Sequence, residues 1–208
     1  MQGKLLTFEG IDGSGKSTQI DLLEKKINDI NIPVSIVREP GGTEVSEKIR
    51  KILLDKKNMC LSSVSESLLF IAARSQLMTE KVLPKLKKNK VVICDRFIDS
   101  TVAYQGYGRG LNVEYLEKLN YFGTYGRIPD LTIIIDIDPK NSIERLLDKE
   151  HDRMESSGFE FYSKVQKGYH KIAFSEPDRC KMIDGHQSIE KVFDLIWLCV
   201  YENFLKGF

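Results

Sequence analysis

The chain has no excess of either charge, because its 208 residues include 31 lysines and arginines and 30 aspartates and glutamates. A protein that holds a nucleic acid along its surface usually carries a basic excess, so this balance argues against a nucleic-acid partner. The lysines that do gather, at positions 85, 87, 88 and 90, are typical of the solvated end of a helix.

Membrane-spanning runs and a signal peptide are also lacking. The longest apolar runs, such as residues 195–200, are far shorter than the roughly 20 residues with which a helix crosses a bilayer. The N-terminus leads directly into an apolar strand, with none of the features of a signal peptide. We therefore expect no membrane partner.

Cysteine is scarce, and its pattern argues against two kinds of site. Cysteines 60, 94, 180 and 199 form no CxxC pair, and no histidine stands at metal-ligand spacing from them. Cys94 lies within an apolar run, where a thiol behaves as a small hydrophobic group. A disulfide framework and a zinc site are not indicated, and we expect a reducing, cytoplasmic location.

What the sequence does contain is an alternation of short apolar runs with stretches of helical spacing. We predict strands at residues 5–8, 33–38, 91–95, 131–136 and 181–184, and helices around 20–27, 43–54, 65–86, 99–104, 113–122, 142–147, 159–174 and from 188 onward. The glycines at 106, 108 and 110 indicate a loop. Strands that alternate with helices predict an α/β fold, with a central parallel sheet of about five strands and helices on both faces. Since neither a repeat nor a linker divides the chain, we predict one domain over residues 1–208.

Residues 8–18 carry the most specific motif. Gly10, four residues, Gly15, Lys16 and Ser17 make the full phosphate-loop pattern between a predicted strand and a predicted helix. Glycines let successive backbone N–H groups point into one concavity at a helix N-terminus, where an anion is favoured. Lys16 would reach the β- and γ-phosphates of a nucleoside triphosphate, and Ser17 would give its hydroxyl to Mg²⁺. The predicted phosphate-binding residues are Gly10, Ile11, Asp12, Gly13, Ser14, Gly15, Lys16, Ser17 and Thr18.

A phosphate loop leaves the reaction open, and the Asn-Lys-x-Asp guanine reader of GTPases is missing. Asp95 and Arg96 instead end the third predicted strand, at the edge where ligands bind in open α/β sheets. The Asp95 carboxylate resembles the acid that holds magnesium, directly or through water, opposite a phosphate loop. Arg96 would offer its planar guanidinium to a second phosphate group. The alternative is a structural salt bridge between the two residues.

Seven blocks together resemble the thymidylate kinase family across nearly the whole chain. They are residues 8–18, 38–43 (Arg-Glu-Pro-Gly-Gly-Thr), 69–74, 95–97, 100–106 (Ser-Thr-Val-Ala-Tyr-Gln-Gly), 129–132 and 152–155. The resemblance implies a P-loop NTPase fold with a short lid at about 148–158, and a homodimer packed through helices. It also implies transfer of the γ-phosphoryl group of ATP to thymidine 5′-monophosphate (dTMP), with Mg²⁺, giving ADP and thymidine diphosphate (dTDP) for dTTP biosynthesis.

By this resemblance, five residues would bind the nucleoside part of dTMP. Phe70 would stack on the thymine ring, since an aromatic face suits a base. Arg74, at i+4 on the same helix, would donate to a pyrimidine carbonyl. Thr101 and Gln105 would reach the base edge, and Tyr104 would close the pocket around the sugar. Plainer interpretations are a core role for Phe70 and a capping or surface role for Thr101 and Gln105.

The resemblance also assigns residues around the acceptor phosphate. Asp12 would orient the acceptor near its sugar 3′-hydroxyl, although an aspartate in a turn also stabilises its own backbone. Glu39 and Arg50 match positions that flank the acceptor site, with an exposed helix position as the alternative for Arg50. Arg96 would hold the acceptor phosphate in line with the moving group. Whether the bond between Glu39 and Pro40 is cis stays open.

The lid departs from the family pattern. Members with a small-residue loop such as Gly13-Ser14 usually carry several basic residues in the lid. This chain offers Lys149 and Arg153, with Arg145 at the end of the preceding helix. We predict Arg153 as the cation that meets the transferring phosphoryl group, against the alternative of a charge on the lid surface.

Two other functions stay open. One is a kinase for cytidylate, uridylate or deoxyguanylate, but Phe70 with Arg74 and Thr101 favours a pyrimidine with a carbonyl at position 4, since an amino group is a poor partner for arginine. The other is a nucleotide-dependent switch without an acceptor, which would not need Arg96, Arg74 and Phe70 to converge. By resemblance, adenine would bind at the loop after residue 184.

Overall fold

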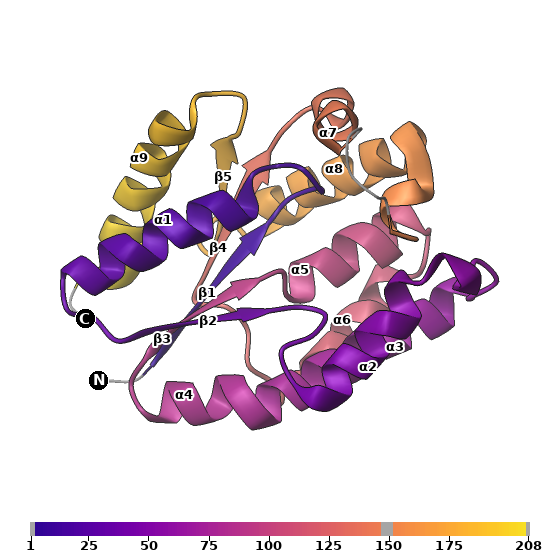
Figure 1. Ribbon diagram of the computed structural model, residues 1–208, viewed down its shortest axis with the longest axis horizontal. Helices are drawn as coiled ribbons and strands as arrows, with labels where there is room; N and C mark the ends of the chain where they lie inside the picture. The colour runs from indigo at the N-terminus through magenta and orange to yellow at the C-terminus, as the bar shows by residue number, and fades with distance from the viewer. Residues whose placement is uncertain (1–2, 147–151, 207–208) are drawn as a thin grey trace.

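The structure, a computed structural model, describes residues 3–146 and 152–206. Its centre is a five-stranded parallel sheet in the order β2-β3-β1-β4-β5 (Figure 1). The strands are β1 Lys4–Glu9, β2 Val34–Arg38, β3 Val91–Asp95, β4 Leu131–Asp136 and β5 Cys180–Asp184. The predicted α/β fold with a parallel sheet of five strands is confirmed.

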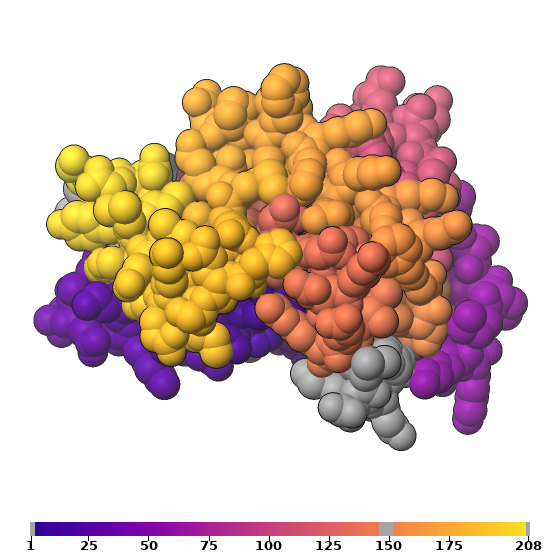
Figure 2. All heavy atoms as spheres, turned by 90° about the horizontal axis from the view of Figure 1, so that it is seen from above, coloured from indigo at the N-terminus to yellow at the C-terminus, as the bar shows by residue number. Residues whose placement is uncertain are grey.

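Helices cover both faces of the sheet (Figure 1). Because successive strand residues face opposite sides, Leu6 packs beneath α1 (Lys16–Asp29) and α9 (Ile189–Val200). Its neighbour Leu5 packs on the other face, beneath the end of α3 (Ser63–Leu77). Seen from above, α1 lies beside α9, and α7 (Pro139–Leu146) lies beside α8 (Gly158–Ser175) (Figure 2). The remaining elements are η1 Lys56–Asn58, α2 Glu44–Leu54, η2 Met78–Val82, α4 Leu83–Lys87, α5 Ile98–Thr101, η3 Val102–Gly108, α6 Val113–Gly123, η4 Glu155–Ser157 and η5 Tyr201–Leu205.

The predicted long helix over 65–86 is confirmed, since α3, η2 and α4 run without a break from Ser63 to Lys87. Within residues 3–146 and 152–206, no helix combines the length and apolar character needed to cross a membrane.

The helix predicted to start at Ser142 instead begins at Pro139. Asp138 caps the N-terminus of this helix. Its carboxylate accepts a hydrogen bond from the backbone N–H of Lys140 at 2.8 Å, and its backbone carbonyl accepts from the Ser142 N–H. Ser142 Oγ is used elsewhere and donates to the carbonyl of Asp12 at 2.5 Å. The predicted end at residue 147 lies outside the described residues.

The glycine loop predicted around 106–110 is mostly helical. Gly106 and Gly108 lie in the π-helical η3, and Gly110, with φ +77°, lies in the loop that follows. A Cβ on Gly108 would come within 2.7 Å of the Phe161 ring on α8. Glycine at this position therefore permits close packing of two helices, a role that local sequence does not distinguish from a turn.

Candidate active site

The predicted phosphate loop connects the end of β1 to the start of α1. Gly10 has φ +132°, and a Cβ there would lie 2.4 Å from the carbonyl oxygen of Ile135, so only glycine fits. Gly15, with φ +94°, precedes the first residue of α1, where the free N–H groups of a helix face an anion. The loop therefore has the backbone geometry of an anion site.

Lys16 is folded onto this loop. Its Nζ donates to the carbonyls of Gly10 and Ile11 at 3.1 and 2.9 Å, and only 7% of the residue is exposed. Burial, together with the nearby Arg96, lowers the pKa of Lys16 to about 8. An ammonium held by two carbonyl oxygens can exchange them for phosphate oxygens, which are stronger partners.

A pocket, here called the phosphate-loop pocket, opens on the loop. It contains most of the residues predicted to bind the ATP phosphates. It is lined by Asp12, Gly13, Ser14, Gly15, Lys16, Ser17, Thr18, Gln19, Arg38, Glu39, Arg50, Asp95, Arg96, Arg145, Glu155, Gly185, Gln187, Ile189 and Val192. Two predicted residues, Gly10 and Ile11, are absent from this lining and take part through their backbone carbonyls. The Ile11 side chain is 2% exposed and packs in the core.

The loop after Asp184, predicted to contact adenine, contributes Gly185 and Gln187 to the lining of the phosphate-loop pocket. Arg38 lines the same pocket and was not predicted. It ends β2 in the same way that Arg96 follows β3, so its position at a strand end could have identified it.

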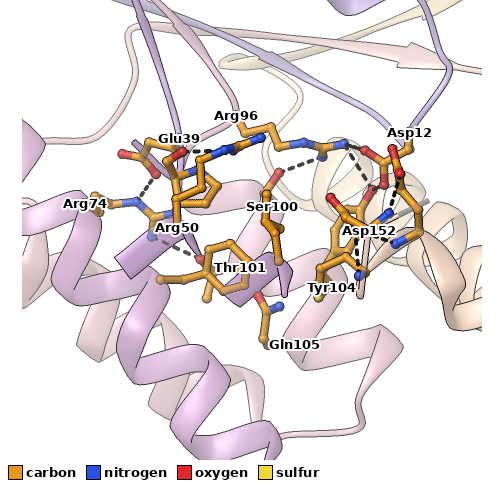
Figure 3. A pocket seen from close by; sticks show the side chains of 15 residues that line it. Asp12, Glu39, Arg50, Arg74, Arg96, Ser100, Thr101, Tyr104, Gln105 and Asp152 are labelled. Atoms are coloured by element: carbon orange, nitrogen blue, oxygen red, sulfur yellow. Dashed lines mark hydrogen bonds and ion pairs between the residues drawn. The ribbon is translucent and has the colours of Figure 1, made fainter. Parts of the chain in front are cut away.

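A second pocket, here called the acceptor pocket, shares part of its lining with the first. Figure 3 shows the side chains that line it. It contains all nine residues predicted for dTMP: Asp12, Glu39, Arg50, Phe70, Arg74, Arg96, Thr101, Tyr104 and Gln105. The further lining residues are Pro40, Leu54, Ser100, Asp152, Met154 and Glu155. The two pockets share Asp12, Glu39, Arg50, Arg96 and Glu155, so a ligand in each would meet at two arginines.

Arg96 lies at this junction in a conformation that is unusual for its type. Its φ is +69°, and its backbone N–H donates to Phe8 O at 3.0 Å. The guanidinium donates to Gly10 O at 3.0 Å and to Asp12 Oδ1 at 2.5 Å. It also lies over the Tyr104 ring, 5.0 Å from the centroid. A strained backbone that is held in place by several contacts is typical of functional sites. Here these contacts fix the Arg96 guanidinium at the junction of the two pockets.

Asp12 is held from three sides. Besides the Arg96 contact, its Oδ2 accepts from the hydroxyls of Tyr104 and Tyr162 at 2.9 and 3.1 Å. Burial would raise the pKa of Asp12, but Arg96 and Lys16 outweigh burial and lower the pKa to about 2. The carboxylate is therefore charged near neutral pH and fixed in the wall between the pockets.

Glu9 supports this arrangement from below and was not predicted. It is fully buried and accepts hydrogen bonds from Phe97 N at 2.7 Å, Ser100 Oγ at 2.6 Å and the Tyr169 hydroxyl at 2.8 Å. Burial and the charge of Asp99 raise the pKa of Glu9 to about 7. It anchors the segment that follows Arg96. An acidic residue ending a buried apolar strand was the signal that could have found it.

Arg74 projects into the acceptor pocket but is largely occupied by the protein (Figure 3). The residue is 2% exposed and donates to Glu39 at 2.7 Å, Thr101 at 3.0 Å, Asn120 at 2.5 Å and Phe97 O at 2.9 Å. Four of its five N–H groups are used, which leaves one for a ligand carbonyl. Since Thr101 accepts from Arg74, its own hydroxyl hydrogen is available to a ligand.

Glu39 has one oxygen on Arg74 and one with no hydrogen-bond partner among the described residues. The residue is 5% exposed and lines both pockets, and its peptide bond to Pro40 is cis. Burial raises the pKa of Glu39 to about 7 against the opposing charge of Arg74. The unpartnered oxygen is therefore available to a donor on a ligand or water.

Arg153 does not occupy the position predicted for it. It is 4% exposed, pairs with Glu66 at 2.7 Å and donates to Leu53 O at 2.7 Å, and it lines neither pocket. Its charge is neutralised by a buried carboxylate from a distant helix, which no local pattern reveals. Arg145 instead lines the phosphate-loop pocket and donates to Gly13 O at 3.0 Å. The other candidate, Lys149, lies outside the described residues.

The parallel sheet, the phosphate loop and a second pocket joined to it by shared arginines define a P-loop phosphotransferase acting on nucleotides. The thymidylate kinase family model matches residues 8–196, and the chain belongs to this family. A thymidylate kinase of Caldanaerobacter subterraneus subsp. tengcongensis is 45% identical over 207 residues, which cover 100% of this chain and 99% of that protein.

Two further comparisons agree with this assignment. A thymidylate kinase of Chlorobium phaeobacteroides is 48% identical over 191 residues, covering 87% of each chain. The crystal structure of thymidylate kinase from Ehrlichia chaffeensis has a TM-score of 0.79 and 39% identity, and the match covers 97% of this chain and 99% of that one.

Proposed function

We propose that this protein transfers the γ-phosphoryl group of ATP to the 5′-phosphate of dTMP, giving ADP and dTDP. Membership of the thymidylate kinase family makes it an ATP-dependent phosphotransferase of this kind. The single observation that carries the proposal is the junction of the two pockets at Asp12, Arg50 and Arg96. There, a triphosphate and a monophosphate would meet end to end.

The donor side is proposed to work through the phosphate loop. Backbone N–H groups at the start of α1 would hold the β-phosphate, and Lys16 would move from its two carbonyl partners to the β- and γ-phosphates. Arg145, already on the loop at Gly13, is the described cation best situated to take the role first assigned to Arg153.

Mg²⁺ is proposed to bind beside the γ-phosphate. Ser17 and Asp95 line the phosphate-loop pocket and offer a hydroxyl and a carboxylate oxygen, the hard ligands that this ion prefers. The described residues contain no group of three His, Cys, Asp or Glu side chains suited to a metal. Two protein oxygens fit an ion held mainly by phosphates and water, which would neutralise charge on those phosphates.

On the acceptor side, Arg96 is proposed to hold the dTMP phosphate with the guanidinium edge that now faces Asp12. An oxygen of that phosphate attacks the γ-phosphorus, the bond to the β-phosphate bridging oxygen breaks, and ADP leaves. The attacking oxygen is already ionised near neutral pH, so no side-chain base is needed. Positioning and charge neutralisation then supply the catalysis.

The nucleoside is proposed to lie deeper in the acceptor pocket. Phe70 would stack on the base, Thr101 and Gln105 would meet its edge, and the remaining N–H of Arg74 would donate to a carbonyl. Tyr104 would close around the sugar, next to Asp12.

The proposal extends to the whole molecule. It includes one domain over residues 1–208, a lid at about 148–158, a homodimer and a cytoplasmic location. The first four residues of this predicted lid, 148–151, lie outside the described residues.

A coupled assay of ADP release, with ATP and Mg²⁺ against a panel of nucleoside monophosphates, tests this function. We expect dTMP to have the highest kcat/KM. Comparable turnover of cytidylate, uridylate or deoxyguanylate would contradict the choice of dTMP while leaving the kinase class intact. ADP release that does not depend on any acceptor would favour the nucleotide-dependent switch.

A further inference from the structure

Glu66 is a buried carboxylate outside both pockets that contacts two separate parts of the chain, residues 105–109 and Arg153. It lies on α3 and is 1% exposed. Its Oε1 accepts from Gln105 Nε2 at 2.9 Å and from Arg109 Nε at 3.3 Å. Its Oε2 lies 2.7 Å from Arg153 Nη1. The proposed reaction does not use Glu66, so its burial needs another explanation.

The contact with Gln105 fixes which way that side-chain amide points. A carboxylate oxygen only accepts hydrogen bonds, so the amide must turn its NH₂ group toward Glu66. The amide carbonyl then points away from Glu66. Gln105 lines the acceptor pocket, beside Thr101 (Figure 3). Among the described residues, none donates a hydrogen bond to this carbonyl oxygen.

Two arginines pair with the Glu66 side chain. Arg153 is itself 4% exposed, and Arg109 lies over the Phe161 ring, 4.4 Å from its centroid. Both oxygens of Glu66 therefore face N–H donors, and Gln105 can join them only through its NH₂ group. The pair with Glu66 also explains why Arg153 is turned away from the phosphates.

An inward carbonyl oxygen discriminates between pyrimidines. Thymine and uracil carry an N3–H donor on the edge next to their O4 carbonyl, whereas cytosine presents a bare N3 acceptor there. A carbonyl oxygen pairs with the first and leaves two acceptors facing each other with the second. A site built to pair with a donor rejects the analogue that lacks it.

We infer that Glu66 is a positioning residue that sets base specificity, by holding Gln105 with its carbonyl oxygen toward N3–H of thymine. This inference rests on the proposed dTMP kinase function. It assigns to a residue outside the acceptor pocket the choice between N3–H bases and cytosine.

The test is Glu66→Gln, assayed for kcat/KM with dTMP, dUMP and dCMP. The substituted amide can either donate or accept, so Gln105 is free to turn over. We expect the ratio of dTMP to dCMP to fall about tenfold, the value of one hydrogen bond. The ratio of dTMP to dUMP should stay within about twofold, because both bases carry N3–H. A merely loosened pocket would change both ratios.

Glu114→Gln is the matched control, because Glu114 pairs with Lys118 at 2.6 Å on the exposed surface of α6. Gln105→Met is a second variant, for use if Glu66→Gln does not fold. It keeps the side-chain volume and removes the amide carbonyl, so its ratio of kcat/KM for dTMP to that for dCMP should also fall about tenfold. An unchanged ratio in Glu66→Gln or Gln105→Met, with wild type preferring dTMP, would overturn the inference alone. Wild type that does not prefer dTMP would instead overturn the proposed function.

Discussion

Two arginines at the acceptor pocket, the buried Arg74 and the half-buried Arg96, are each paired with a carboxylate. Arg74 pairs with Glu39 at 2.7 Å, and Arg96 pairs with Asp12 at 2.5 Å. A buried pair contributes little net stability, since desolvation of both ions offsets their attraction, but removal of one partner strands the other. Arg74 is therefore both a candidate ligand contact and a structural requirement, and its substitution affects folding before it affects base recognition.

At the scale of the residue, we predict that Arg74→Ala lowers the free energy of unfolding by about 3–5 kcal/mol at pH 8.5. Glu39, whose pKa is about 7, would lose the cation that favours its charged form, so the folded variant must either bury an unpaired charge or bind a proton. Below pH 7 the Glu39 carboxyl is neutral in the folded wild type, and without Arg74 its pKa rises further. The electrostatic part of the loss therefore appears only as the pH rises above about 7.

Urea unfolding at pH 5.5 and 8.5 measures this effect. The control is Arg127→Ala, which removes the partner of Asp130 from a half-exposed pair and should cost less than about 1 kcal/mol. A loss for Arg74→Ala that is equal at the two pH values would show that Glu39 is not the group left stranded.

At the scale of the element, the contact between η3 and α8 determines the geometry of the acceptor pocket. η3 carries Tyr104 and Gln105, and α8 carries Tyr162, which donates to Asp12 at 3.1 Å. The two helices approach closely at Gly168, where a Cβ would lie 2.7 Å from the Tyr107 ring and 2.9 Å from its Cβ. The second of these atoms is fixed by the backbone, so the helices would have to separate.

We predict that Gly168→Ala is destabilising, although alanine is the better helix former by about 1 kcal/mol. Overpacking of this contact should cost about 1–3 kcal/mol beyond that gain and raise the KM for dTMP more than the KM for ATP. Lys167→Ala, an exposed position on the same helix, is the control. Thermal unfolding and steady-state kinetics check both parts, and a Gly168→Ala variant as stable as wild type would refute the close approach.

At the scale of the whole molecule, one edge of the sheet collects both pockets. The loops after β1, β2 and β3 supply Asp12, Glu39 and Arg96, because the carboxyl ends of parallel strands meet at the same edge. Lys16 lines only the phosphate-loop pocket, and Phe70 lines only the acceptor pocket. The two binding events should therefore be separable by substitution even though the pockets share a wall.

We predict that a non-hydrolysable ATP analogue and dTMP each raise the thermal midpoint of the wild type. At a ligand concentration of a hundred times the Kd, each should add about 2.7 kcal/mol to the free energy of unfolding. Lys16→Met should lose the response to the analogue and keep the response to dTMP, and Phe70→Ala should do the reverse. Differential scanning fluorimetry measures both. Loss of both responses in either variant would mean that the pockets form one inseparable site.

The sequence by itself determined the features that depend on local order. The phosphate loop is contiguous, so the spacing of Gly10, Gly15 and Lys16 already specifies a glycine turn between strand and helix. Apolar runs located the five strands within a few residues, because a strand buried on both faces requires them. The residues predicted for the acceptor pocket could be identified by family resemblance, and the parallel strand order then brings several of them to one edge.

Only the tertiary structure decided how buried charges are paired. The sequence around Arg153 does not distinguish an arginine that faces phosphates from one that faces a carboxylate, because its partner Glu66 is far away in the chain. The occupation of Arg74, the anchoring role of Glu9 and the helical Gly108 were hidden for the same reason. A buried charge or a close helix contact takes its meaning from the group it meets, and that group is chosen by packing between distant segments.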